Sequence, residues 1–159
     1  MRTFIFVLTL LMGVTSAEAT SRRVEAMRGA TARLEQMKQS KGARDKATVL
    51  QETWDVLHLS AMSPEAVNPS DEFLHEFFTL TDTYMEVDNS GAAMDVFSDY
   101  YDKHRKAIDA YAKKKDRKTK YEIIERVLKA EKEYGTATDS ETAEEEGPQK
   151  TTREPSMTR

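Results

Sequence analysis

The sequence predicts an all-α fold: an up-and-down antiparallel bundle of four helices, followed by a fifth C-terminal helix and a disordered tail. Three observations support this. Apolar residues recur at steps of three and four along most of 21–134, which is the period of an amphipathic helix. No segment alternates between apolar and polar residues as a half-buried strand does. Turn residues separate the apolar stripes, and helices joined by short links favour antiparallel packing.

The first two expected helices cover about 21–39 and 45–62. Gly42 suits the end of the first, and Asp45 suits the N-cap of the second. Their predicted core residues are Val24, Met27, Ala30, Leu34 and Met37 in the first helix, and Val49, Leu50, Trp54, Leu57 and Ala61 in the second.

The third expected helix covers about 69–86 and is the most apolar. Pro64 and Pro69 interrupt the chain before it, because a proline inside a helix costs about 3 kcal/mol. Asn68 is the predicted N-cap, with Pro69 at the first helical position. Its apolar residues are Phe73, Leu74, Phe77, Phe78, Leu80, Tyr84 and Met85.

The segment 92–134 contains neither Gly nor Pro, yet its apolar pattern predicts two helices. One apolar stripe runs from Val96 to Ala112 and a second from Tyr121 to Leu128, and the two are out of register. Eight polar residues separate the stripes. We therefore expect helices over about 91–114 and 120–134.

Three regions follow from these patterns: a leader over 1–19, a helical-bundle domain over 20–135 and a tail over 136–159. The tail is rich in Thr, Glu, Ser and Pro, and buries too little apolar surface to offset the entropy of ordering it. We expect it to be disordered.

The N-terminus has the pattern of a secretory signal peptide. A basic residue precedes the apolar run from Phe4 to Val14, and Ala17-Glu18-Ala19 provides small residues for cleavage between Ala19 and Thr20. The run is shorter than the roughly 20 residues that span a bilayer, so no membrane span is expected after cleavage. The chain has no Cys and no glycosylation sequon, which favours a bacterial periplasm over eukaryotic secretion.

Charge is segregated along the chain. No Lys or Arg lies between Ala47 and Asp102, where there are twelve acidic residues. The segments on either side are basic, with eight basic and three acidic residues in 22–46, and nine basic and two acidic residues in 103–120. Neighbouring helices of opposite sign would neutralise each other internally. Alternatively, the charged surfaces bind a partner.

The densest basic cluster is a candidate for such binding, to an anionic surface or an acidic protein of the envelope or exterior. Nucleic acid is not expected, because the leader exports the chain and no aromatic platform accompanies the cluster. The candidate residues are Lys113, Lys114, Lys115, Arg117, Lys118 and Lys120.

No motif predicts a catalytic or metal site. The segment His75–Thr79 begins like the zinc motif H-E-x-x-H but lacks its second histidine. Asp95, Asp99 and Asp102 form a helical ladder that could hold a cation with His75 or His104, although such a ladder is typical of a solvated face. An enzyme acting through His75, Asp99 and His104 is therefore the least supported hypothesis.

A cleaved leader, a methionine near the start of the first helix and a histidine late in the fourth resemble the small soluble periplasmic cytochromes of the four-helix b type. The resemblance extends over 20–112 and is carried by Met27, in Val24–Met27, and by His104, in Asp102–Arg105. It implies a bundle that holds a non-covalent haem b between Met27 and His104 as axial ligands, for electron transfer.

The sequence thus leads to two hypotheses. We expect an exported, non-enzymatic binding protein without a cofactor, acting through the basic cluster in 113–120 or the acidic face of 47–102. The alternative is the haem-binding bundle that the resemblance implies.

Overall fold

The computed structural model describes residues 22–39, 43–114 and 118–144. Every regular element in these ranges is a helix, which confirms the predicted all-α class for the described residues. None of the described helices has the length and apolar character needed to cross a membrane. The predicted leader and cleavage site lie outside the described residues, as do residues 145–159.

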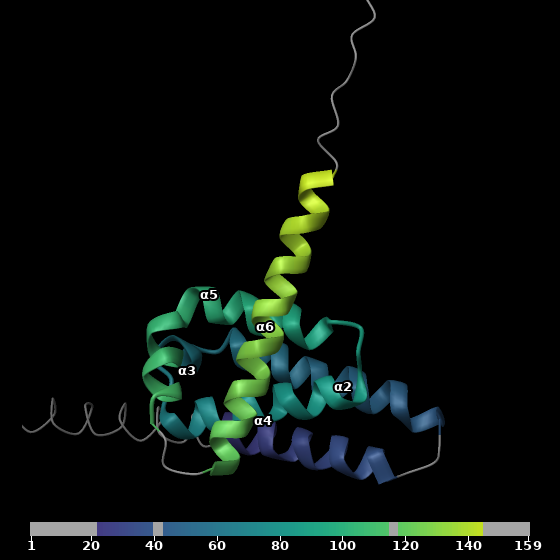
Figure 1. Ribbon diagram of the computed structural model, residues 1–159. Coiled ribbons are helices and arrows are strands. Elements are labelled where there is room, and N and C mark those ends of the chain that lie inside the picture. The colour runs from purple at the N-terminus through teal and green to yellow at the C-terminus, as the bar shows by residue number, and fades with distance from the viewer. Residues whose placement is uncertain (1–21, 40–42, 115–117, 145–159) are drawn as a thin grey trace, which may run out of the picture.

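A first helix over 22–39 precedes five labelled helices (Figure 1). Helices α2 and α5 agree with their predicted ranges within two residues at each end, and the predicted break between the last two helices is present. The labelled helices are α2 (Ala43–Ala61), α3 (Pro64–Val67), α4 (Asp71–Val87), α5 (Ala92–Ala112) and α6 (Lys118–Glu144).

The start of α4 differs from the prediction. Ser70, not Asn68, is the N-cap, and its hydroxyl accepts a hydrogen bond of 3.1 Å from the backbone N–H of Phe73. Asn68 instead ends the short helix α3, which Pro64 begins. Serine caps a helix as well as asparagine does, so sequence alone does not choose between two such residues this close together.

The end of α6 also corrects the prediction. The helix continues through Gly135 to Glu144, so residues 136–144 are helical rather than disordered. A glycine costs only about 1 kcal/mol within a helix, and extending an existing helix is easier than starting one. No proline lies within α6 to end the helix, and the next proline along the chain is Pro148.

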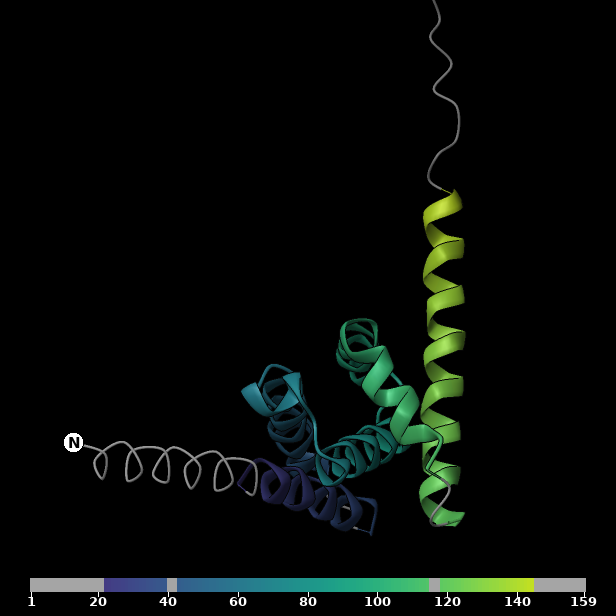
Figure 2. The same cartoon turned by 90° about the vertical axis from the view of Figure 1, so that its left-hand side faces the viewer.

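Helix α4 is the centre of the fold and contacts α2, α5 and α6. Its contacts with the first helix join Arg28 to Glu76 and Lys38 to Glu86, and the constant offset of 48 residues shows that these two helices run parallel. In a square four-helix bundle the first and third long helices are diagonal, whereas here they are paired directly. Helix α6 lies across the other helices instead of alongside them (Figures 1 and 2).

The core is built on aromatic residues that α4 and α5 contribute at helical spacing. The ring centroids of Phe77 and Tyr100 are 4.8 Å apart, and those of Phe78 and Phe97 are 5.2 Å apart. All four side chains are at most 2% exposed, as are Met27 and most of the apolar residues predicted to be core. Aromatic pairs at such distances add to the stabilisation from burial.

Tyr100 also fixes the corner formed by α3. Its hydroxyl donates a hydrogen bond of 3.0 Å to the carbonyl of Ala66, which ties α5 to α3. Burial raises the pKa of Tyr100 well above its ordinary value, because the anionic phenolate is disfavoured there. One turn later α5 is kinked at His104, whose ring lies 4.5 Å from that of Tyr100.

Phe77→Ala should lower the free energy of unfolding by about 3–5 kcal/mol, because it leaves a cavity between α4 and α5. The control Leu59→Ala changes a side chain that is 54% exposed, and should change stability by less than about 0.5 kcal/mol. Urea unfolding followed by circular dichroism measures both. Similar losses for the two variants would contradict the assignment of Phe77 to the core.

Tyr100→Phe should cost about 0.5–1.5 kcal/mol at neutral pH, because the Ala66 carbonyl loses its donor. The raised pKa of Tyr100 makes its contribution to stability complete below the unfolded value of about 10, and this contribution falls as the pH rises toward the folded pKa. The advantage of the wild type over the variant should therefore shrink by about 1.4 kcal/mol at pH 11. Urea titrations at pH 8 and pH 11 test this, and a constant difference would refute it.

Candidate functional site

The basic cluster of 113–120 is described only in part: Lys115 and Arg117 lie outside the described residues, as does the side chain of Lys118. Lys114 donates to both carboxylate oxygens of Asp71, at 2.8 and 2.7 Å. Lys120 is 8% exposed, with its ammonium group 4.2 Å from the centroid of the Tyr111 ring. These two cations therefore hold α4, α5 and α6 together, and Lys113 is exposed.

Much of the charge segregation is internal complementarity. Six of the twelve acidic residues in 47–102 pair with cations from other helices or from the link after α5. The pairs join Arg28 to Glu72 and Glu76, Arg33 to Glu52, Lys38 to Glu86, Lys114 to Asp71, and Arg126 to Asp82.

Two of these pairs are partly buried. Hydrogen bonds to Glu76, above all, raise the pKa of Arg28, and a hydrogen bond to Asp82 raises that of Arg126. The pKa of Lys38 is also raised: burial alone would lower it, but hydrogen bonds to Glu35 and Glu86 outweigh this. Arg28, Arg126 and Lys38 are therefore already paired within the fold.

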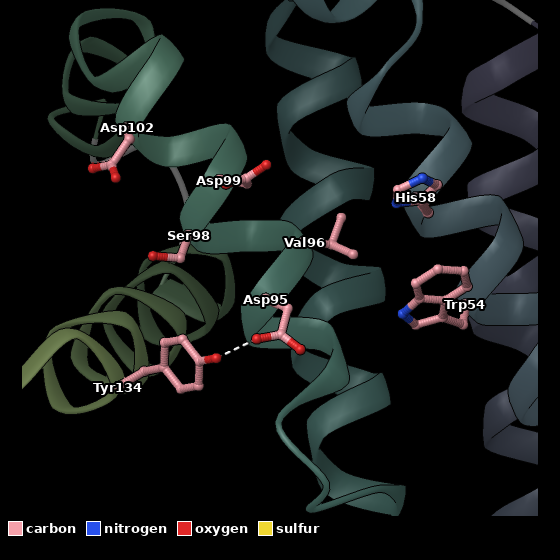
Figure 3. A pocket seen from close by; sticks show the side chains of 8 residues that line it. All are labelled: Trp54, His58, Asp95, Val96, Ser98, Asp99, Asp102 and Tyr134. Atoms are coloured by element: carbon pink, nitrogen blue, oxygen red, sulfur yellow. Dashed lines mark hydrogen bonds between the residues drawn. The ribbon is translucent and has the colours of Figure 1, made fainter. Parts of the chain in front are cut away.

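Three of the other acidic residues lie together on α5 and line a pocket of about 430 Å³ between α2, α5 and α6 (Figure 3). We call it the acidic pocket. Its eight lining residues include no Lys or Arg. They are Trp54, His58, Asp95, Val96, Ser98, Asp99, Asp102 and Tyr134.

The α5 wall of the acidic pocket carries Asp95, Asp99 and Asp102. Residues at such steps lie on one face of a helix, which concentrates negative charge there. Asp95 accepts a hydrogen bond from the Tyr134 hydroxyl, and Asp99 pairs with Lys103 at 3.3 Å on the exposed surface. The carboxylate of Asp102 makes no hydrogen bond or ion pair with any described residue. Its carboxylate remains available to a ligand.

The α2 wall is aromatic. The rings of Trp54 and His58 are stacked, with centroids 4.8 Å apart and an angle of 9° between their planes. Both side chains are partly exposed. A cation near an aromatic face gains electrostatic stabilisation, and a carboxylate opposite adds to it. The acidic pocket can therefore hold an organic cation or a Lys or Arg side chain.

The alternative sites are not assembled in the same way. In the described part of the chain, no three His, Cys, Asp or Glu residues are arranged so that they could hold a metal ion together. Of the three residues of the enzyme hypothesis, only Asp99 lines the acidic pocket. His75 lies on α4 and does not line it. His104 lines another surface pocket, formed by Asp102–Ala107 of α5 alone.

The haem ligands implied by the cytochrome resemblance have separate surroundings. Met27 is fully buried in the core, and His104 lies against Tyr100 at the surface. The pocket lined by His104 does not include Met27. The haem site that the resemblance implies stays a prediction.

Sequence reasoning recognised only part of the acidic pocket. It singled out the ladder of Asp95, Asp99 and Asp102, but assigned Trp54 to the core and gave no role to His58. The four-residue step from Trp54 to His58 was the available signal, since it places both rings on one helix face. That this face meets α5 depends on tertiary packing.

No protein-family model, curated protein or solved structure matches this chain. The geometry and chemistry of the acidic pocket are therefore the basis for inferring function.

Proposed function

We propose that the chain is an exported, non-enzymatic binding protein, built as an up-and-down helical bundle, that binds positively charged groups of a partner at the acidic pocket. One observation carries this proposal: three aspartates and a stacked Trp–His pair line one pocket, whose lining includes no Lys or Arg. Carboxylates gathered in one place attract a cationic partner and favour it over an anionic one.

The acidic pocket is a better candidate than the basic cluster of 113–120. In the described part of that cluster, Lys114 is paired with Asp71, and Lys120 is buried against Tyr111. A partner that used these cations would have to break contacts within the fold. The Asp102 carboxylate could bind a partner without breaking a contact of the fold, because it has no hydrogen-bond or ion-pair partner among the described residues.

Binding is favoured over catalysis for a chemical reason. A nucleophilic hydroxyl needs an adjacent base to activate it. Within the described residues, no hydrogen bond joins Ser98 to His58, although both line the acidic pocket. Export rests on the predicted leader, and it would bring the acidic pocket into contact with periplasmic or extracellular proteins.

Octalysine is a simple probe for this proposal, and Trp54, the only tryptophan in the chain, reports its binding by fluorescence. Asp102→Asn should weaken octalysine binding by about two- to fivefold at low ionic strength, as expected for loss of one exposed charge. Added salt should reduce the difference, because it screens exposed charges.

The matched control is Glu25→Gln, which likewise replaces one exposed carboxylate by its amide, on the first helix and away from the acidic pocket. Glu25→Gln should leave the affinity for octalysine about equal to that of the wild type. Equal weakening by both variants would show a response to net charge alone. Absence of binding to the wild type would reject the proposed function.

A further inference from the structure

We propose that the partner presents a basic amphipathic helix, whose apolar face packs against the end of α2 and α3 while its basic face pairs with the aspartates of the acidic pocket. This inference rests on the proposed function and specifies the kind of partner. A second, independent feature of the surface supports it: three large exposed apolar side chains, Leu59, Met62 and Val67, which lie close together in sequence at the end of α2 and on α3 and which we call the apolar patch.

The apolar patch gathers the large exposed hydrophobic side chains of the described residues. Leu59 is 54% exposed, Met62 71% and Val67 63%, and all three fall within nine residues of sequence. Single exposed apolar residues are ordinary, but a group of them marks an interaction site. Methionine adapts its shape readily and suits such a surface.

The patch is continuous with the aromatic wall of the acidic pocket. Trp54, His58 and Met62 follow one another at four-residue steps, and the Met62 N–H donates to the His58 carbonyl at 3.2 Å, which extends the helical turn past the end of α2. Side chains at this spacing share one face of a helix. One stripe therefore runs from the indole of Trp54 to the exposed thioether of Met62.

Helix α3 places Val67 at the same end of the molecule. The hydrogen bond from Tyr100 to the Ala66 carbonyl holds α3 against α5. Figures 1 and 2 show α3 and α5 on the same side of α4. The surface thus combines an apolar and aromatic side on α2 and α3 with an acidic side on α5.

A helix with segregated apolar and basic faces matches this surface better than other partners of positive charge. Asp95, Asp99 and Asp102 extend over two turns, about 10 Å at 1.5 Å per residue, which is the spacing of cations at similar steps on a facing helix. A polar cation would leave the apolar patch uncovered. A neutral apolar helix would bring no cation to the aspartates of the acidic pocket.

A second copy of the chain does not supply such a helix from its first helix, the strongly basic one. The apolar side of that helix, including Val24 and Met27, is buried in its own core, and Arg28 is paired with Glu72 and Glu76. An anionic lipid surface would be repelled by the three aspartates. The occupant that we propose is therefore a segment of another protein.

The test uses the full chain and an 18-residue Leu/Lys peptide patterned as an amphipathic helix, with a scrambled peptide of the same composition as the control. Titrations followed by Trp54 fluorescence and by calorimetry compare the two peptides. The patterned peptide should bind about tenfold more tightly than the scrambled one, because only it can cover the patch and reach the aspartates together.

Leu59→Ser with Met62→Ser should weaken binding of the patterned peptide about fivefold or more, and leave octalysine binding unchanged. Met62→Leu, with a side chain of similar volume, should retain the binding of the wild type. Both changed positions are more than half exposed, so the double variant should stay folded, as its circular dichroism and unfolding would verify.

Equal binding of the two peptides, or full binding by the double serine variant, would overturn this inference. The proposed function would still stand if Asp102→Asn weakened octalysine binding. Failure of every cationic probe to bind would overturn both. Self-association that the double variant abolishes, seen by sedimentation without peptide, or Met62-dependent binding to phosphatidylglycerol vesicles, would assign the patch to another occupant and would also overturn this inference.

Discussion

Two carboxylates buried on the central helix constrain the whole structure. Glu76 and Asp82 are 8% and 6% exposed on α4, and each requires a cation, because an unpaired buried charge is strongly destabilising. The cations come from opposite ends of the chain. Arg28 of the first helix donates to Glu76 at 2.9 Å, and Arg126 of α6 donates to Asp82 at 3.0 and 2.6 Å. These pairs fix both flanking helices against α4.

The basic segment before the acidic stretch supplies one of these cations, Arg28, whereas Arg126 lies beyond the basic segment 103–120. The first helix and α6 bring their cations to α4, where the described ion pairs use them. Helix α5 also carries acidic residues, but its ladder faces α2, which has no Lys or Arg after Lys46. The acidic pocket therefore keeps its negative charge, as a consequence of where the fold places its cations.

The proline-rich corner connects the core to the proposed binding surface. Pro64 begins a helix of only four residues, too short to bury both of its sides. Ala66 of this helix packs inward and accepts the hydrogen bond from Tyr100, while Val67 remains exposed. The same corner leaves Met62 exposed just beyond the end of α2. The buried tyrosine thus positions an apolar patch beside the acidic pocket, and core and surface share one structural element.

Sequence by itself determined the all-α class, the approximate helix ranges and most of the core, from Met27 to Phe77, because burial of one helix face imposes its period on the chain. It also located the ladder of α5. Only tertiary structure decided which charges are paired within the fold. Lys114 is paired with Asp71, whereas Asp102 lines a pocket together with Trp54, 48 residues away. Periodicity shows which side of a helix is buried, but not which helix covers it. That choice depends on the packing of side chains far apart in the sequence.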